Sequence, residues 1–268
     1  MRKIRVQVVS VLLLLSLLLT GCSSEVKNYV HTDIGLKNEA ENALQEKYDE
    51  AFVIKAVWTE SQTTFHAICA PTKDESIVFE AEIYKDGRGV YDDEYIQALV
   101  ADQIEDRMQN KVGNIFEDCY VVAHFYGSTP SLEELMESVD EPKSLEYFKN
   151  MTVEEYYALD SDVRLGVKIF VNNSNLKYDE ETVLEEFKCF ARLFEDEPMQ
   201  NAGFSGYCVD EDTMNECKEY FLKESKARGT FDEIIIGAEE FGFGFNDGII
   251  NVTFEEYYAE RKDGKTNE

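Results

Sequence analysis

The sequence predicts an α+β fold, in which a mixed or antiparallel sheet is flanked by helices and the chain forms one or two lobes. Three observations support this prediction. Several short segments alternate apolar and polar residues, as half-buried strands do. Other segments repeat apolar residues at helical spacing behind a Ser, Thr or Asp cap. Apolar residues make up 44% of the chain, with 17 Phe and 15 Tyr, which is enough for a packed core.

The first lobe is expected over 35–126, with the element order αβββαβ. Its first helix has one apolar stripe that includes Leu36, Leu44 and Tyr48, and Asp92 or Asp93 can cap the second helix. The expected elements are a helix over 36–51, strands over 52–58, 65–69 and 79–83, a helix over 94–110 and a strand over 119–126.

Residues 127–150 are acidic and are interrupted by Pro130 and Pro142, which predicts a linker or an inserted arm between the lobes, and Ser131 with Glu134 predicts the capping box of a short helix within it. The second lobe is expected over 151–260, and Asn246-Asp247-Gly248 is a strong hairpin signal near its end. The expected elements are a helix over 153–159, a strand over 164–171, a helix over 179–194, a strand over 204–209, a helix after Asp210 that ends at Gly229, an apolar segment over 231–236, and hairpin strands over 241–245 and 249–254.

One short sequence occurs twice. The residues from Thr152 to Ala158 recur almost unchanged from Thr253 to Ala259, but the flanking sequences differ. Repeated use of the same capping box and aromatic pair explains this better than a duplicated domain does.

The N-terminus has the layout of a secretory signal. Arg2, Lys3 and Arg5 precede an apolar run over 6–19, which is shorter than the ~20 residues of a membrane span. The run ends in Leu19-Thr20-Gly21-Cys22. An uncleaved anchor and a plain cleaved signal are the alternatives, but Leu-Thr-Gly is a poor site for ordinary cleavage.

The last four of these residues resemble the lipobox of bacterial lipoproteins. The resemblance implies that residues 1–21 are a lipoprotein signal peptide and that the thiol of Cys22 carries a diacylglyceryl group. Residues 22–34 would then form a polar tether. The lipid bilayer would be a partner through the acylated, palmitate-type anchor at Cys22, and the protein would lie on the outer face of the cytoplasmic membrane.

The charge of the chain excludes nucleic acid as a partner. Removing the three basic residues of the signal leaves 23 Lys and Arg against 55 Asp and Glu, a net charge of −32. Nucleic-acid binding depends on basic side chains that displace counterions from phosphates. The same excess of acid argues against a second, electrostatic attachment to anionic lipid. It favours cationic partners, or it keeps a surface protein soluble.

No catalytic residue, metal site or cofactor is predicted. The sequence has no metalloprotease, nucleophile-elbow, P-loop or dinucleotide motif. Its three histidines, His31, His66 and His124, have no partners that sequence can identify. Asp210 with its acidic neighbours is better explained as a helix cap than as a calcium site.

The cysteines after Cys22 are odd in number, so at least one thiol of an exported chain stays without a disulfide. Free buried thiols are the favoured interpretation, and a disulfide is the alternative. The five residues are Cys69, Cys119, Cys189, Cys208 and Cys217.

The segment Phe241-Gly242-Phe243-Gly244-Phe245 is the sharpest local feature. Alternation in a strand places Phe241, Phe243 and Phe245 on one face and both glycines on the other. The rings could face a groove and bind a sugar or peptide ligand. Rings in the core, with the glycines beneath a packed helix, are the better-supported alternative.

The chain as a whole is similar to uncharacterised small surface lipoproteins of Gram-positive bacteria, in its helix and strands and in Ala70-Pro71, Asp86-Gly87 and Asp92-Asp93. This similarity implies no activity. A non-enzymatic module that binds an envelope component or a membrane protein is the expected function. The alternatives are a ligand-capture lipoprotein for a membrane transporter and an envelope hydrolase that uses carboxylates or His66.

Overall fold

A computed structural model describes residues 33–126, 130–159, 163–172, 179–195, 201–223, 234–235, 238–246 and 249–263. The predicted signal peptide, Cys22, His31, most of the tether, Gly229 and the turn residues Asp247 and Gly248 lie outside these ranges. Of the apolar segment predicted over 231–236, only Ile234 and Ile235 are described, and they lie in a turn.

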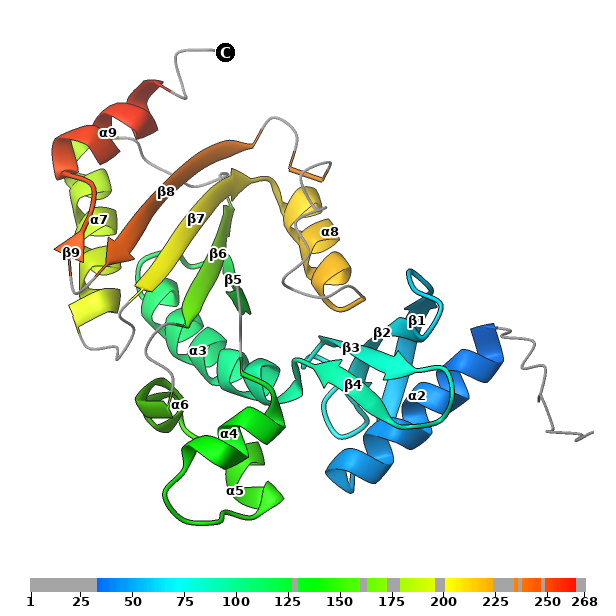
Figure 1. Cartoon of the computed structure of the whole chain (residues 1–268). Coiled ribbons are helices and arrows are strands. Elements are labelled where there is room, and N and C mark those ends of the chain that lie inside the picture. The colour runs from blue at the N-terminus through cyan, green and yellow to red at the C-terminus, as the bar shows by residue number, and fades with distance from the viewer. Residues whose placement is uncertain are drawn as a thin grey trace, which may run out of the picture.

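The N-terminal part is a helix packed on a four-stranded antiparallel sheet with strand order β1-β2-β3-β4 (Figure 1). These elements are α2 (Asp33–Tyr48), β1 (Phe52–Trp58), β2 (Thr64–Pro71), β3 (Phe79–Tyr84) and β4 (Val90–Asp93). The core side of β3 alternates Phe79, Ala81 and Ile83, all buried, as the sequence pattern predicts. The sequence analysis missed β4, because its residues show no apolar alternation.

The remaining elements build a five-stranded sheet with strand order β5-β6-β7-β8-β9. The β6–β7 pair is parallel and the other pairs are antiparallel, so the sheet is mixed. The predicted α+β fold is therefore confirmed. The elements are α3 (Tyr95–Gly113), β5 (Cys119–Tyr126), α4 (Leu132–Ser138), α5 (Leu145–Lys149), α6 (Val153–Leu159), β6 (Arg164–Asn172), α7 (Glu180–Glu195), β7 (Asn201–Val209), α8 (Glu211–Phe221), β8 (Glu239–Asn246), β9 (Ile249–Ile250) and α9 (Phe254–Asp263).

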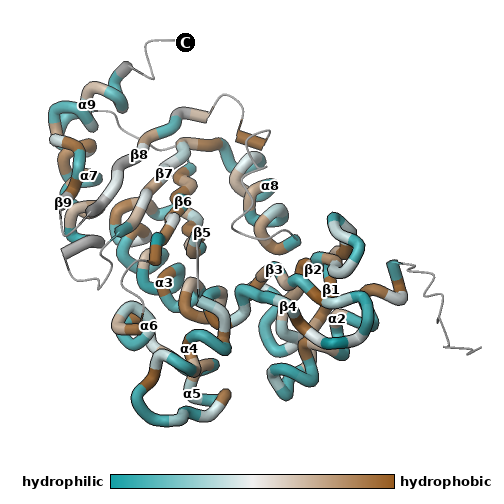
Figure 2. The backbone as a smooth tube through the Cα atoms, viewed as in Figure 1, coloured by the Kyte–Doolittle hydropathy of each residue, from teal (hydrophilic) through white to brown (hydrophobic). Residues whose placement is uncertain are grey.

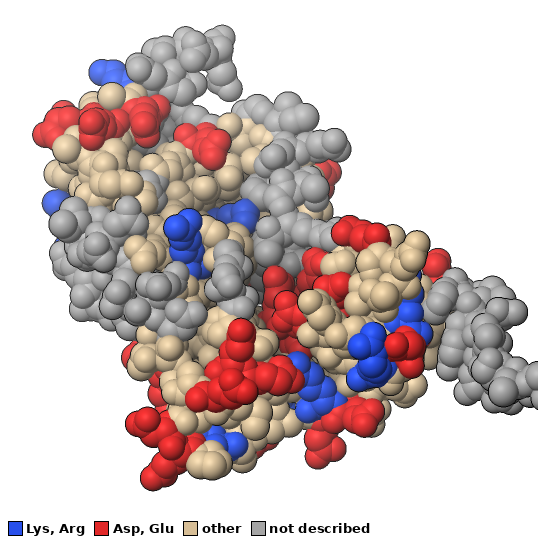
Figure 3. Space-filling model, viewed as in Figure 1, with Lys and Arg blue, Asp and Glu red and all other residues tan. Residues whose placement is uncertain are grey.

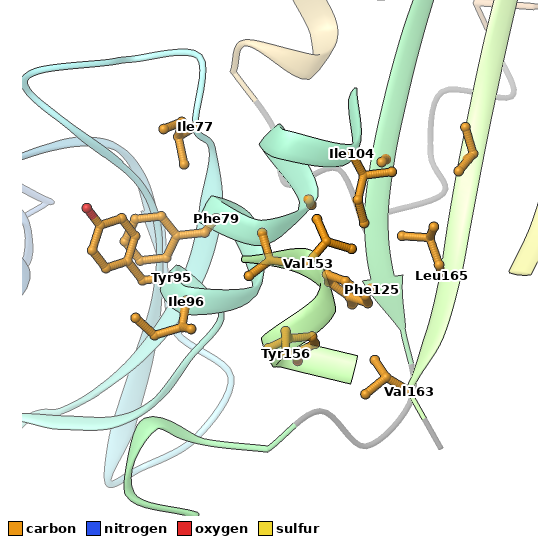
Figure 4. Packing of buried hydrophobic residues seen from close by; sticks show 14 of the residues in the cluster. Ile77, Phe79, Tyr95, Ile96, Ile104, Phe125, Val153, Tyr156, Val163 and Leu165 are labelled. Atoms are coloured by element: carbon orange, nitrogen blue, oxygen red, sulfur yellow. The ribbon is translucent and has the colours of Figure 1, made fainter. Parts of the chain in front are cut away.

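One hydrophobic core joins the two sheets through α3. Tyr95, at the start of α3, packs its ring 5.0 Å from Phe79 of the first sheet. Further along the same helix, Ile104 lies beside Phe125 and Leu165 of the second sheet (Figure 4). Figure 2 shows that hydrophobic and hydrophilic residues alternate along α7 and α8. Within the described residues, no helix is both long and apolar enough to cross a membrane.

The predicted capping boxes form. Glu155 Oε2 accepts the backbone N–H of Thr152 at 2.8 Å, and Glu256 Oε2 accepts that of Thr253 at 2.9 Å. Each box begins a helix whose first tyrosine, Tyr156 or Tyr257, is fully buried. The second box also ends the last strand earlier than predicted, because helix α9 begins at Phe254.

Two local expectations were wrong. The N-cap of α3 is Glu94 instead of Asp92 or Asp93, although the Asp93 carboxylate does accept the N–H of Tyr95 at 3.0 Å. Helix α8 ends at Phe221 with Leu222 as its C-cap, well before Gly229.

Residues 130–150, expected within a linker, contain α4 and α5. Leu135 and Phe148 of these helices are buried in the shared core. The acidic side chains of this segment therefore belong to the outer faces of two docked helices.

The five described cysteines are free thiols, four of them buried and Cys119 half-buried. Cys208 of β7 belongs to the main core, whereas Cys217 belongs to α8 and packs in the second cluster, on the other side of the second sheet. Burial raises the pKa of the Cys217 thiol to about 11, which keeps it protonated. These thiols act as small apolar side chains.

Candidate functional site

The two faces of the second sheet are covered to different extents. Helices α3 and α7 cover one face and bury its apolar side chains in the main core (Figure 1). Helix α8 covers part of the opposite face, where it packs on Phe170 and Tyr207. Beyond α8, toward the start of β6 and β7, the same face is hollowed into a groove. This groove is the candidate functional site.

A row of glycines forms the floor of the groove. His124 of β5 pairs with Gly166 of β6, Gly166 pairs with Gly203 of β7, and Gly203 pairs with Gly244 of β8. Residues in register across neighbouring strands point to the same face of a sheet. Three adjacent strands therefore present bare backbone at the same level, which leaves room for another molecule to approach closely.

The groove has a volume of about 530 Å³, within the usual range for a small-ligand site. Polar side chains that can donate hydrogen bonds surround the glycine floor, and the described residues of the lining include no carboxylate. The lining residues are His124, Tyr126, Gly166, Val167, Lys168, Gly203, Phe204, Ser205 and Gly244.

Two side chains from β5 lie over the glycine floor. A Cβ atom added at Gly166 would lie 2.6 Å from Cε1 and 2.9 Å from Nε2 of His124, so the imidazole ring rests on the bare backbone there. A Cβ atom added at Gly203 would lie 3.6 Å from the hydroxyl oxygen of Tyr126. The His124 and Tyr126 rings are 6.0 Å apart. Only Gly166 is required by such a contact, because a Cβ atom there would overlap the His124 ring, whereas a Cβ atom at Gly203 would meet Tyr126 at an ordinary distance.

Lys168 completes the polar wall. Its Nζ lies 3.4 Å from Nδ1 of His124 and 6.0 Å from the centre of the Phe221 ring of α8. An ammonium group only donates, so Nδ1 of His124 is the acceptor in this contact. Ser205 is the register partner of Lys168 on β7, which places its hydroxyl on the same face.

The outer strand fixes the far end of the floor. A Cβ atom at Gly242 would lie 2.8 Å from the carbonyl oxygen of Phe204, and one at Gly244 would lie 2.7 Å from Nδ2 of Asn251. The side-chain oxygen of Asn251 accepts the N–H of Gly244 at 2.8 Å. The glycines of the Phe-Gly repeat are therefore required by close contacts, and they face the groove side of the sheet.

The rings of that repeat belong to the other side. Phe241 is 3% exposed and packs against Phe190 and Tyr257 in the core, at ring distances of 5.7 and 5.8 Å. The backbone register pairs Phe243 with Phe204 and Phe245 with Ala202. The side chains of Phe243 and Phe245 lie outside the described residues. For Phe241, the core placement that the sequence favoured is the one observed.

The groove is a basic site in a strongly acidic chain. Among the described lining residues Lys168 is the one charged side chain, while the whole chain has a formal net charge of −29. Arg164, exposed at the start of β6, pairs with Tyr126 and adds a second cation to the same face. In Figure 3, basic side chains stand in the tan region between the acidic groups of α9 above and those near α4 and α5 below.

A second polar cluster lies on the outer face of the first sheet. Nδ1 of His66 is 2.8 Å from Oε1 of Glu80, its Nε2 is 3.8 Å from Oε2 of Glu60, and Trp58 stacks on the ring at 5.1 Å. Burial, followed by the charge of Glu80, raises the pKa of nearby Glu94 to about 7. In the described part of the chain, no group of three or more His, Cys, Asp or Glu side chains is arranged to hold a metal ion.

A smaller hollow of about 370 Å³ lies between α2 and the turn after β3. Glu39 and Glu46 contribute to its wall, and the backbone at Gly87 and Gly89 adopts positive φ angles. Neither this hollow nor the His66 cluster combines a bare floor with convergent donors as the groove does.

No family model matches the chain, and a comparison with curated proteins finds no relative. A crystal structure of a DUF5037 family protein from Ruminococcus gnavus ATCC 29149 is similar to it. The TM-score is 0.65, with 19% sequence identity, and the match covers 85% of this chain and 99% of that chain. Similarity at this level of identity concerns the fold alone.

Proposed function

We propose that this protein is a lipid-anchored binding module on the outer face of the cytoplasmic membrane, and that it holds its ligand in the glycine-floored groove. The anchoring half of the proposal rests on the lipobox-like residues that end in Cys22. The binding half rests on a single structural observation: glycines of β6, β7 and β8 lie in register with one another and with His124 of β5.

Gly203, in the middle of the row, supports binding because glycine there is unfavourable for the fold itself. Glycine inside a strand destabilises it by roughly 0.5–1 kcal/mol relative to alanine. Gly203 has an ordinary strand conformation, and a Cβ atom there would meet only the Tyr126 hydroxyl at a normal contact distance. Neither backbone strain nor core packing requires glycine at this position, whereas access for a ligand does.

The size of the groove favours a small molecule, which keeps ligand capture for a membrane transporter as the second candidate. The tether is compatible with either function. Ten residues separate Cys22 from Asp33, and such a chain spans at most about 40 Å when fully extended. The groove would then operate close to the membrane and within reach of a membrane protein.

Site-specific photo-crosslinking in intact cells tests the proposal. Tyr126, 41% exposed at the groove, is replaced by benzoyl-phenylalanine, and Tyr91, 58% exposed on β4 of the other sheet, receives the same replacement as a matched control. Irradiation should produce an adduct at position 126 and none at position 91. Mass spectrometry of the adduct separates an envelope component from a transporter subunit.

Equal labelling at the two positions, or labelling at position 91 alone, would overturn the groove as the binding site. An adduct at position 126 in a protein that is not attached to the membrane would support the groove as the binding site and would contradict the lipid anchor.

A further inference from the structure

We infer that the hollow between α2 and the turn after β3 binds an extended peptide segment that carries a primary amine. This hollow is separate from the glycine-floored groove, so the inference goes beyond the proposed function and does not depend on it. It follows from three features of the hollow: a row of available polar side chains on α2, a negative charge that the facing turn does not neutralise, and open space in front of that turn.

The first feature is a row of three polar side chains on α2. Asn38, Asn42 and Glu46 follow one another at intervals of four residues, so they lie along a single face of the helix. All three are exposed, and their side chains form no hydrogen bond or ion pair with the described residues. Their polar atoms are therefore available to a ligand in the hollow.

The spacing of this polar row matches an extended peptide. Four residues of an α-helix advance about 6 Å along its axis, and two residues of extended chain advance about 6.6 Å. Every second residue of an extended chain presents its N–H and C=O to the same side. A carboxamide both donates and accepts, so Asn42 and Asn38 can each pair with one of two alternate peptide residues.

The charged end of the polar row defines the rest of the ligand. Glu46 continues the row by one more turn with a group that only accepts hydrogen bonds, and a primary amine at the next alternate position of the peptide would meet it. Glu39 adds a second carboxylate to the wall. Arg88 of the facing turn does not neutralise these groups, because its guanidinium pairs with Asp86 at 2.8 Å and stacks on the Tyr84 ring at 3.7 Å.

The opposite wall leaves room for the peptide. The turn between β3 and β4 lies beside α2 (Figure 1) and contributes Gly87 and Gly89 to the hollow. Both glycines have positive φ angles, of 77° and 101°, and a Cβ atom added to either would meet no described atom within 4 Å. The volume of about 370 Å³ is near the lower end of the range for small-ligand sites, which favours a short segment with small side chains.

The experiment is an NMR titration of the full-length protein with pentaalanine amide, whose N-terminal amine is free, and with its N-acetylated form. The signals followed are the side-chain amides of Asn38 and Asn42 and the backbone amides of Gly87 and Gly89. The free peptide should shift these signals, and acetylation should weaken its binding about threefold, because ion pairs of exposed groups are modest in strength. N-acetyl-lysyl-tetraalanine amide tests whether a lysine side chain replaces the N-terminus as the source of the amine.

Variants on α2 provide the controls. Asn42→Ala should weaken the binding of both peptides, whereas Gln45→Ala removes an exposed carboxamide outside the hollow and should leave binding unchanged. Both substitutions preserve the helix, because alanine is the best helix former. Glu46→Gln should remove the preference for the amine, so that the free and acetylated peptides bind equally.

Equal affinity of the two peptides for the wild-type protein, unchanged binding in Asn42→Ala, or no shift with any of the peptides would each overturn the inference. Butylamine adds a further test, since an affinity equal to that of the peptide would show a simple cation site and would contradict peptide recognition. A response at Gly203 of the groove in place of Gly87 and Gly89 would overturn the hollow as the site and would leave the proposed function intact.

Discussion

Lys149 of α5 forms an ion pair of 2.8 Å with Glu50, the second residue after α2. This contact links the helices before the second sheet to the N-terminal part of the protein. Both side chains are little exposed, at 12% and 11%. Lys73 and the Tyr95 hydroxyl also bind the Glu50 carboxylate, at 2.8 and 2.9 Å. Burial alone would raise the pKa of Glu50, but the hydrogen bonds from Lys149, Lys73 and Tyr95 outweigh it and lower the pKa below the ordinary 4.5.

The variant Lys149→Met should therefore destabilise the protein by about 2 kcal/mol at pH 7, because a buried carboxylate loses a charged donor. Urea unfolding measures the change. Lys223→Met is the control: it removes an ion pair with Glu219 whose side chains are 70% and 75% exposed, and it should cost less than about 0.5 kcal/mol. Equal losses in the two variants would contradict the buried role of Lys149.

Removing the lysine should also change how stability depends on pH. A carboxyl group with a lowered pKa in the folded state stabilises the protein above its ordinary pKa, and this contribution is lost as the pH falls through the folded value. Lys149→Met raises the pKa of Glu50 in the folded state. The difference in stability between wild type and variant should therefore shrink as the pH is lowered from 7 toward 3.

Glu94 should have the opposite effect on the pH dependence. Its pKa is raised to about 7 by burial and by the charge of Glu80, so its ionisation destabilises the fold. This destabilisation is absent below the ordinary pKa of 4.5, grows as the pH rises from 4.5 to about 7 and stays constant above that. Glu94→Gln removes it. Melting temperatures should show a gain for the variant over wild type that increases from pH 5 to pH 8, and a gain that stays constant with pH would contradict the assignment.

Two glycines of the same strand should respond oppositely to substitution. Gly203→Ala places a methyl group at a normal distance from the Tyr126 hydroxyl and should stabilise the fold by about 0.5–1 kcal/mol. Gly206→Ala, on the core side, would overlap the ring of Phe241 and should destabilise by about 1–3 kcal/mol. Urea midpoints measure both changes. If Gly203→Ala lost stability, the groove would depend on that glycine for structure and not for access.

Cys22→Ala tests the anchor. Removal of the thiol leaves no acceptor for the diacylglyceryl group, so the protein should be released or left with its signal uncleaved. Fractionation of cells together with the mass of the N-terminal peptide distinguishes these outcomes. Membrane attachment with ordinary cleavage in the variant would rule out the lipoprotein assignment.

The elements predicted most accurately from sequence are those whose pattern is local. Strand β5, Cys119–Tyr126, and the helix start at Asp210 were expected at these positions, because alternation and capping depend on residues a few positions apart. The same reasoning failed at β4, whose acidic residues leave no alternation, and at Gly229, which the sequence favoured as a helix end although α8 ends at Phe221.

The groove could not be derived in this way. Gly166, Gly203 and Gly244 are separated by dozens of residues, and they form one row only because β6 and β7 are parallel and in a particular register. The Phe-Gly repeat drew attention to β8, but local alternation does not show which face of the strand lies open. The available signal was an outward-facing glycine in two predicted strands, Gly166 and Gly244, with Gly203 directly before a third.

The continuous core allows the fluorescence of one sheet to report on ligand binding at the other. Because buried side chains of both sheets belong to one cluster through α3, the two halves should unfold in a single cooperative transition. The chain has one tryptophan, Trp58, and it lies on the sheet that does not contain the groove. A ligand bound above Gly203 should therefore shift the fluorescence change of Trp58 to a higher denaturant concentration, although the ligand and Trp58 are not in contact.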